Sequence, residues 1–201
     1  KPKVAIAENV TGMLRANARG YVKEIFTGLK EAGYDVQLFQ FNSARMSVPQ
    51  ARRRVFFVSR RKDLDLPKIE FSFNDKVRNY FDMMKGLNDY GERKELSPLQ
   101  KEIWRATKPG NNLGTAHKKG YFFGTFKINP YHPIPSVLAT GDTLTLWDKP
   151  CYFSDVELVR AQTFPDDFDF CGQRVQYVTG MSVPPYMIKK IAEKIISFWK
   201  L

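Results

Sequence analysis

Three runs near the start of the chain have the polar and apolar pattern of β-strands. Residues 4–7 (VAIA) are entirely apolar, which is typical of a buried strand. Residues 35–41 (DVQLFQF) alternate polar and apolar side chains, as a half-buried strand does, and residues 54–59 supply another strand-like run.

Between the first two runs the apolar spacing becomes that of a helix. In residues 19–32 the apolar positions recur at i, i+3, i+4 and i+7, and Gly33 is placed to end the helix. Strand, helix and strand in succession predict an α/β fold class. The apolar face consists of Val22, Ile25, Phe26 and Leu29.

In residues 62–130 the pattern is broken repeatedly by proline, glycine and asparagine. Residues 76–87 (KVRNYFDMMKGL) predict a short helix, and residues 120–128 (GYFFGTFKI) predict a strand pair or an aromatic surface strand. We therefore expect a second, smaller domain that is irregular and mostly β.

The end of the chain is regular again. Ser154 and Glu157 have the spacing of a capping box at a helix N-terminus, and Pro184 and Pro185 are placed to open the final helix. The sequence predicts three sections: residues 1–62, the small domain 63–150, and residues 151–201, whose helices return to the first section. The apolar face of the final helix is Ile188, Ile191, Ala192, Ile195, Ile196 and Trp199.

The composition favours a polyanionic partner. The 201 residues include 32 Lys and Arg against 21 Asp and Glu, a formal charge of +11. Nucleic acid is the first expectation and a membrane surface the second. Between Ile103 and Gly141 there is no acidic residue, and the basic side chains there are Arg105, Lys108, Lys118, Lys119 and Lys127.

Several classes of protein do not fit the sequence. The chain has no apolar run of the roughly 18 residues that a membrane span needs and no signal-peptide pattern, so we expect a soluble, cytoplasmic protein. Cys151 and Cys171 have no metal-ligand spacing and predict buried structural thiols. His117 and His132 fall in the irregular segment and predict surface positions rather than catalysts.

The stretch VPQARRRVFFV (residues 48–58) places arginines directly before a strand. In an extended chain Gln50, Arg52 and Arg54 point one way and Arg53 the other, so two guanidinium groups can converge on one polar target. The alternative is a solvated basic face that touches phosphates.

Glu8 and Asn9 stand at the C-terminal end of the first predicted strand, an edge where α/β proteins commonly bind ligands. Shielded from water, Glu8 could serve as a general acid with a raised pKa. A plain surface or capping role is the alternative.

Five segments follow one another in a specific order along the chain: AENV (7–10), VPQARRRVFFV (48–58), HPIPSVLATGDTLTL (132–146), VRAQTFPDDFDF (159–170) and TGMSVPP (179–185). This order resembles the second half of a DNA cytosine-5 methyltransferase of the bacterial or phage type. The resemblance implies the C-terminal half of a Rossmann-like methyltransferase domain, with a target recognition domain in the variable stretch.

The resemblance implies a chemistry and roles for residues. In this family a cysteine thiolate adds to C6 of a cytosine flipped out of duplex DNA, and C5 then takes the methyl group of S-adenosyl-L-methionine. Glu8 matches the family glutamate that interacts with N3 and the exocyclic amine of the cytosine. Arg54 matches the arginine that binds O2 of the cytosine. Arg52 matches the arginine that steadies the glutamate and the DNA backbone.

The resemblance also implies the contacts of cofactor and DNA. Asn9, Ser182 and Val183 are the expected cofactor contacts, and Met181 stands where the family commonly has asparagine. The expected DNA contacts are Gln50, Arg105, Lys118, Lys119 and Lys127.

The glycine-rich cofactor loop and the Pro-Cys motif of the family's N-terminal section do not occur in this sequence. We therefore expect these 201 residues to be inactive alone, either as part of a longer chain or as one subunit of a split restriction-modification methyltransferase. A non-catalytic DNA-binding module on the same scaffold and an RNA substrate are the alternatives.

Overall fold

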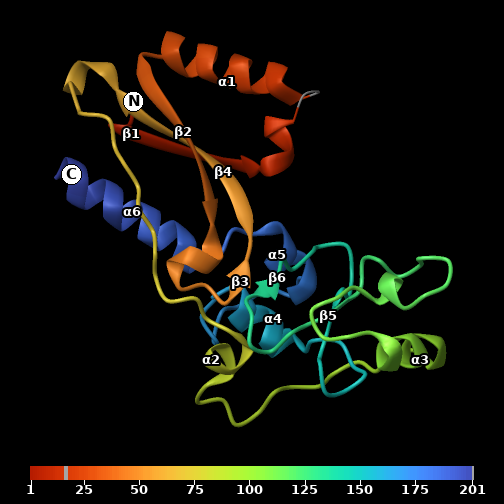
Figure 1. The fold of residues 1–201 in the computed structure, drawn as a ribbon. Coiled ribbons are helices and arrows are strands. Elements are labelled where there is room, and N and C mark those ends of the chain that lie inside the picture. Colours follow the sequence, from red (N-terminus) through yellow and green to blue (C-terminus); the bar gives the residue numbers. More distant parts are fainter. Residues whose placement is uncertain (16–17, 201) are drawn as a thin grey trace. The chain divides into compact units, whose positions relative to one another are not determined.

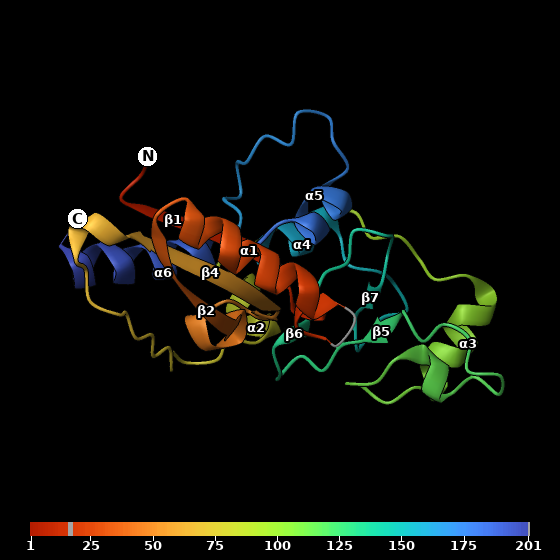
Figure 2. The same ribbon diagram turned by 90° about the horizontal axis from the view of Figure 1, so that it is seen from above.

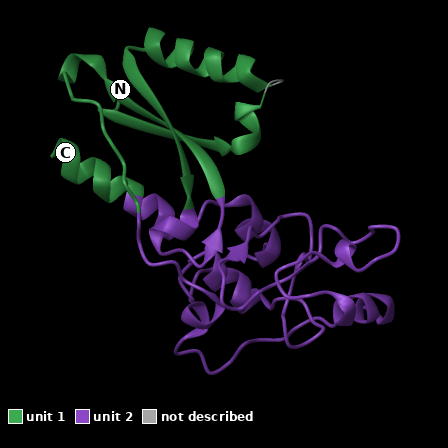
Figure 3. Cartoon of the chain, in the orientation of Figure 1, with its two compact units in different colours: residues 1–42, 53–73, 191–201 green, residues 43–52, 74–190 purple. Residues whose placement is uncertain are grey.

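A computed structural model describes residues 1–15 and 18–200 of the chain (Figure 1). The chain divides into two compact units (Figure 3). Unit 1 comprises Lys1–Asn42, Arg53–Phe73 and Ile191–Leu201, and unit 2 comprises Ser43–Arg52 and Asn74–Lys190. The predicted return of the chain to its first section at residue 151 is wrong, because residues 151–190 pack with the middle of the chain and only Ile191 onward belongs to unit 1.

Unit 1 is built on a three-stranded sheet in the order β1-β4-β2. Both neighbouring pairs are antiparallel, so β1 and β2 run in the same direction and helix α1 connects them. The predicted strand, helix, strand order is confirmed. The elements are β1 (Val4–Val10), α1 (Arg19–Glu31), β2 (Tyr34–Asn42) and β4 (Arg53–Arg61), with short 3-10 helices at Thr11–Leu14 and Lys62–Leu64.

The sheet buries apolar side chains on both faces, since alternate residues of a strand point to opposite sides. Phe57 of β4 meets Phe26 of α1, with ring centroids 5.7 Å apart. On the other face Phe56 packs on Phe41, 5.5 Å away. Figures 1 and 2 show α1 on one face and the unit 1 part of helix α6 (Pro185–Trp199) on the other.

The prediction that residues 4–7 form a buried strand is wrong. β1 lies at the edge of the sheet, and in the described part of the chain only β4 pairs with it. As a result Ile6 is 41% exposed and Val10 52% exposed. An apolar run alone does not distinguish a central strand from an edge strand.

Unit 2 is held together by helices and loops around an apolar core that includes Met83, Ile134, Leu146 and Leu158. Its strands are two residues long and form two parallel pairs, β3 with β6 and β5 with β7. The elements are β3 (Gln50–Ala51), α2 (Tyr80–Met84), α3 (Pro98–Ala106), β5 (Phe126–Lys127), β6 (Ile134–Pro135), β7 (Leu144–Thr145), α4 (Asp155–Ala161) and α5 (Val175–Met181), with 3-10 helices at Ser43–Met46 and Leu113–Thr115.

The predicted mostly β character of the small domain is therefore wrong. In residues 120–128 only Phe126–Lys127 is a strand. Gly120 and Phe122 have φ values of +70° and +64°, which turn the backbone away from an extended path.

The local signals at the end of the chain are confirmed. The Ser154 hydroxyl accepts from the Glu157 amide, and the Glu157 carboxylate accepts from the Ser154 amide, before helix α4. Helix α6 starts at Pro185, and Ile191, Ile195 and Trp199 are buried, whereas Ile188 and Ile196 are exposed. No helix in the described part of the chain is long and apolar enough to cross a membrane.

Candidate functional site

Glu8 and Arg54 form an ion pair on one face of the sheet of unit 1. Glu8 of β1 lies opposite Phe56 of β4, and Arg54 lies two residues before Phe56, so the two side chains are diagonal neighbours. Arg54 Nε is 2.8 Å from Glu8 Oε1, and the Arg54 and Glu8 side chains are 16% and 31% exposed.

The side chain of Arg54 is largely shielded from solvent. Burial lowers the pKa of the Arg54 guanidinium, and the negative charge of Glu8 opposes that shift. Arg54 Nη1 also donates to the carbonyl oxygen of Arg53 at 2.8 Å. Arg53 itself is exposed and lies on the opposite face, as the alternation predicts. The pair therefore places a fixed cation beside a carboxylate at the C-terminal end of β1.

Arg52 belongs to unit 2 and is almost completely buried, with 1% of its surface exposed. Its Nη1 donates to the Val137 carbonyl at 2.9 Å, and its Nη2 donates to the Gly180 carbonyl at 2.7 Å. The predicted contact with the DNA backbone is wrong, because the guanidinium is turned into the protein. Its predicted support of Glu8 stays a prediction, since Glu8 belongs to the other unit.

Gln50 is fully buried, so the predicted DNA contact of this residue is wrong. Its carboxamide oxygen accepts from the Val137 amide at 3.1 Å. Its Nε2 donates to Gln162 Oε1 at 2.6 Å and to the Ala161 carbonyl at 3.2 Å. A carboxamide carries both donors and an acceptor, which lets one side chain join two loops inside the protein.

Gln162 completes a buried polar network that sequence reasoning missed. Its Nε2 donates to the carbonyl of Ser182 at 2.7 Å. Gln50, Arg52 and Gln162 thus connect the segments around residues 50, 137, 162 and 180 within unit 2. The only sequence signal was the presence of Gln162 in VRAQTFPDDFDF, one of the ordered segments.

We expect the Arg52→Met substitution to destabilise the protein by about 3 kcal/mol, because two buried carbonyl groups would lose their donors at roughly 1–3 kcal/mol each. Urea unfolding followed by tryptophan fluorescence measures the change. Arg53→Met is the matched control, since Arg53 is exposed. Equal unfolding midpoints for the two variants would show that the Arg52 hydrogen bonds contribute nothing.

The basic side chains predicted to contact DNA differ in their surroundings. Arg105, Lys118 and Lys119 are exposed. Lys127 is buried, and the prediction of a DNA contact there is wrong. Its ammonium group donates to the carbonyls of Trp104 (3.1 Å) and Thr107 (3.0 Å) and lies 3.7 Å from the centre of the Trp104 ring. Burial lowers the pKa of Lys127.

Comparison with known proteins identifies the family of the chain. The model of the C-5 cytosine-specific DNA methylase family matches residues 1–197. The chain belongs to this family. The Type II methyltransferase M.NgoFVII of Neisseria gonorrhoeae is 29% identical over 220 residues, and M.BbvI of Brevibacillus brevis is 28% identical over 218 residues.

The chain spans less than two thirds of these relatives. The matches cover 98% and 97% of this chain but 59% of M.NgoFVII and 58% of M.BbvI. Among solved structures, a protein encoded within an E. coli prophage superposes with a TM-score of 0.78 at 17% identity, covering 100% of this chain and 70% of that one. The Dnmt2 methyltransferase of S. pombe superposes with a TM-score of 0.66 at 14% identity, and the match covers 98% of this chain and 65% of that one. These likenesses show a shared α/β fold.

Methyltransferases of this family use S-adenosyl-L-methionine. The polar groups expected to contact it here are already engaged. Ser182 Oγ donates to the Val178 carbonyl at 2.5 Å, and Asn9 Oδ1 accepts from the Val10 amide at 2.8 Å. Val183 is half-buried, and Met181 is 64% exposed. These residues do not by themselves build a cradle for the cofactor, and their contacts with it stay predictions.

Cys151 does not have the surroundings of an activated nucleophile. Cys151 is buried as predicted, and burial raises the pKa of its thiol, which disfavours the thiolate. Cys171 is exposed, so the prediction of a buried thiol is wrong there. Both cysteines lie in unit 2, whereas Glu8 and Arg54 lie in unit 1. Among the described residues no cluster of histidine, cysteine and carboxylate side chains could hold a metal ion.

Proposed function

We propose that this chain is part of a DNA (cytosine-5-)-methyltransferase that acts on a cytosine flipped out of duplex DNA. The observation that carries the proposal is the Glu8–Arg54 pair, which lies at the end of β1 in a chain of this family. Addition of a thiolate to C6 of the ring moves electron density toward N3 and O2, so the reaction needs a proton donor at N3 and positive charge at O2.

Glu8 and Arg54 supply these two groups from adjacent strands. In the protonated form the Glu8 carboxyl donates to N3, and the Arg54 guanidinium then directs its charge to O2. Because the pair is fixed by the strand register, little reorganisation is needed when the cytosine binds. S-adenosyl-L-methionine supplies the electrophilic methyl group that C5 takes.

We assign DNA binding to the part of unit 2 between residues 74 and 150, which corresponds to the expected target recognition domain. The exposed side chains of Arg105, Lys118 and Lys119 lie in the stretch that has no acidic residue. Their charges suit the phosphates of duplex DNA and give affinity without specifying a base sequence.

The nucleophilic thiolate in this proposal comes from a further section of the enzyme, in the same chain or in a second subunit. The exposed edge of β1, with Ile6 and Val10, supports the docking of such a section, since an apolar edge strand can pair with another strand. A restriction-modification role agrees with the Type II naming of the relatives.

The test is a methylation assay with duplex DNA and S-adenosyl-L-methionine. We expect no 5-methylcytosine from these 201 residues alone and product after addition of the N-terminal section that carries the Pro-Cys motif. The control is the added section with its cysteine changed to serine, which should give none. Product from the 201 residues alone would contradict the need for a supplied thiolate. Tight DNA binding without product in the complete mixture would favour a non-catalytic DNA-binding module.

A further inference from the structure

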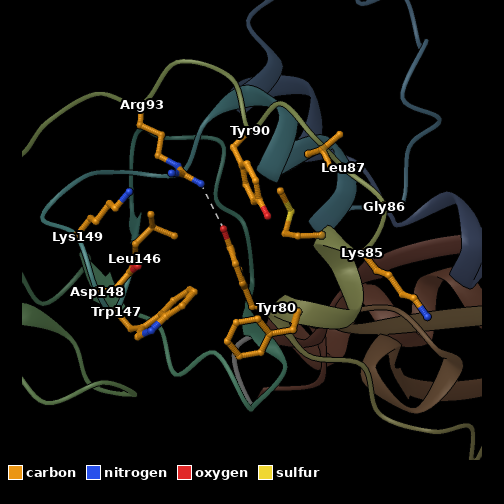
Figure 4. A pocket seen from close by; sticks show the side chains of 12 residues that line it. Tyr80, Lys85, Gly86, Leu87, Tyr90, Arg93, Leu146, Trp147, Asp148 and Lys149 are labelled. Carbon is orange, nitrogen blue, oxygen red and sulfur yellow. Dashed lines mark hydrogen bonds between the residues drawn. The ribbon is translucent and has the colours of Figure 1, made fainter.

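Unit 2 contains a pocket of about 480 Å³ beside helix α2 that the proposed reaction does not use (Figure 4). The volume lies in the range of small-molecule sites. Aromatic and basic side chains dominate its lining, among them Tyr80, Tyr90, Trp147, Lys85, Arg93 and Lys149.

Tyr80, Tyr90 and Trp147 form the aromatic wall of the pocket, and contacts with neighbouring side chains fix the position of Tyr80 and Trp147. The rings of Tyr80 and Trp147 meet edge to face with centroids 4.8 Å apart. The Tyr80 hydroxyl donates to the buried carboxylate of Glu157. Burial and this carboxylate raise the pKa of Tyr80, so the phenol stays neutral. Tyr80 is only 4% exposed, so it holds the half-buried Trp147 ring in place, and Trp147 is the ring of this pair that a planar ligand can reach.

Arg93 also lines the pocket, and its positive charge is paired with the carboxylate of Glu157. Its Nε donates to Glu157 Oε2 at 3.1 Å, and its Nη2 donates to Glu157 Oε1 at 2.8 Å. Its guanidinium lies over the Tyr90 ring, 5.2 Å from the centre. This network fixes both Arg93 and Tyr90 at the pocket.

The positive charges left for a ligand belong to two lysines, and the carboxylate of Asp148, next to Lys149 in the chain, also lines the pocket. Lys85 and Lys149 are exposed, and no carboxylate in the described part of the chain forms an ion pair with either. Figure 4 shows them at opposite ends of the pocket, with the aromatic side chains between them. A ligand that matches this arrangement has a planar ring flanked by an anionic group on each side.

We propose that the pocket binds one unpaired nucleotide of a nucleic acid strand, with the base against Trp147 and Tyr90. A nucleotide within a strand has a phosphate on its 5′ side and another on its 3′ side, which matches Lys85 and Lys149. A free nucleoside monophosphate could engage only one of them. Stacking of a base on an aromatic side chain is typically worth more than a surface ion pair, so Trp147 carries most of the affinity. The site is separate from Glu8 and Arg54, which belong to unit 1.

The test is calorimetric titration of the protein with thymidine 3′,5′-bisphosphate, thymidine 5′-monophosphate, thymidine and inorganic phosphate. We expect the bisphosphate to bind about tenfold more tightly than the monophosphate, because each phosphate contacts one lysine. Lys85→Gln and Lys149→Gln should each remove that advantage. Lys76→Gln, which changes an exposed lysine outside the pocket, should preserve it.

Further variants measure the contribution of base stacking separately from that of the phosphate contacts. Trp147→Leu should weaken every nucleotide by about tenfold or more, and Trp147→Phe should restore part of the loss. Thermal melting of each variant checks that it is folded. Equal affinity for inorganic phosphate and the bisphosphate, or unchanged affinity in both lysine variants, would overturn the proposal. Methylation activity does not enter the readout, so failure here leaves the proposed function intact.

Discussion

The Gly180→Ala variant is expected to lose more than about 3 kcal/mol of folding free energy and to unfold at a lower urea concentration than the wild type. A Cβ atom at this position would lie within 2.5 Å of the Ala139 Cα atom and would also overlap the Leu138 carbonyl carbon. These neighbours are backbone atoms and cannot swing aside as a flexible side chain can. Relief would require helix α5 to move away from the 138–139 segment, and the Gly180 carbonyl would then lose its donor, Arg52.

Urea unfolding and proteolysis of the variant measure this loss. The matched control is Gly28→Ala in helix α1, where a Cβ would meet nothing within 4 Å. Alanine has the higher helix propensity, so the control should be more stable than the wild type by up to about 1 kcal/mol. If Gly180→Ala unfolds at the same urea concentration as the wild type, residues 138–139 do not press on helix α5 as the structure shows.

Local patterns in the sequence predicted local structure correctly. Helix α1, strand β2 and the capping box at Ser154 depend on residues a few positions apart, and each was found in its expected place. Burial depends on partners that are distant in the sequence. β1 has as apolar a pattern as a central strand yet lies at an edge, and Lys127, read as a DNA contact, is covered by the end of helix α3.

The burial of the polar residues of the candidate site could not be predicted from the local sequence either. Gln50 and Gln162 are 112 positions apart and share a hydrogen bond. Alternation along the strand correctly placed Arg53 away from Arg54, but it could not show that Gln50 and Arg52 are buried in unit 2. The resemblance implied DNA contacts for both residues, whereas in the structure their side chains are buried and form hydrogen bonds within unit 2.

The Arg54→Ala change in a complete enzyme is expected to reduce the rate of methyl transfer by about 10²–10³-fold, the usual loss when one donor to a developing negative charge is removed. Two effects combine. The positive charge proposed for O2 of cytosine disappears, and Glu8 loses the partner that lies 2.8 Å away. Single-turnover measurement with saturating DNA and cofactor isolates the chemical step from binding.

Arg53→Ala is the control for the loss of one positive charge next to the same site. Arg53 is exposed and lies on the other face of β4, so its removal should weaken DNA binding slightly at low salt and leave the single-turnover rate within about threefold of wild type. Equal rate losses in the two variants would mean that the strand contributes general positive charge rather than one fixed guanidinium. A loss confined to Arg54 would locate the cation that catalysis needs at the Glu8–Arg54 pair.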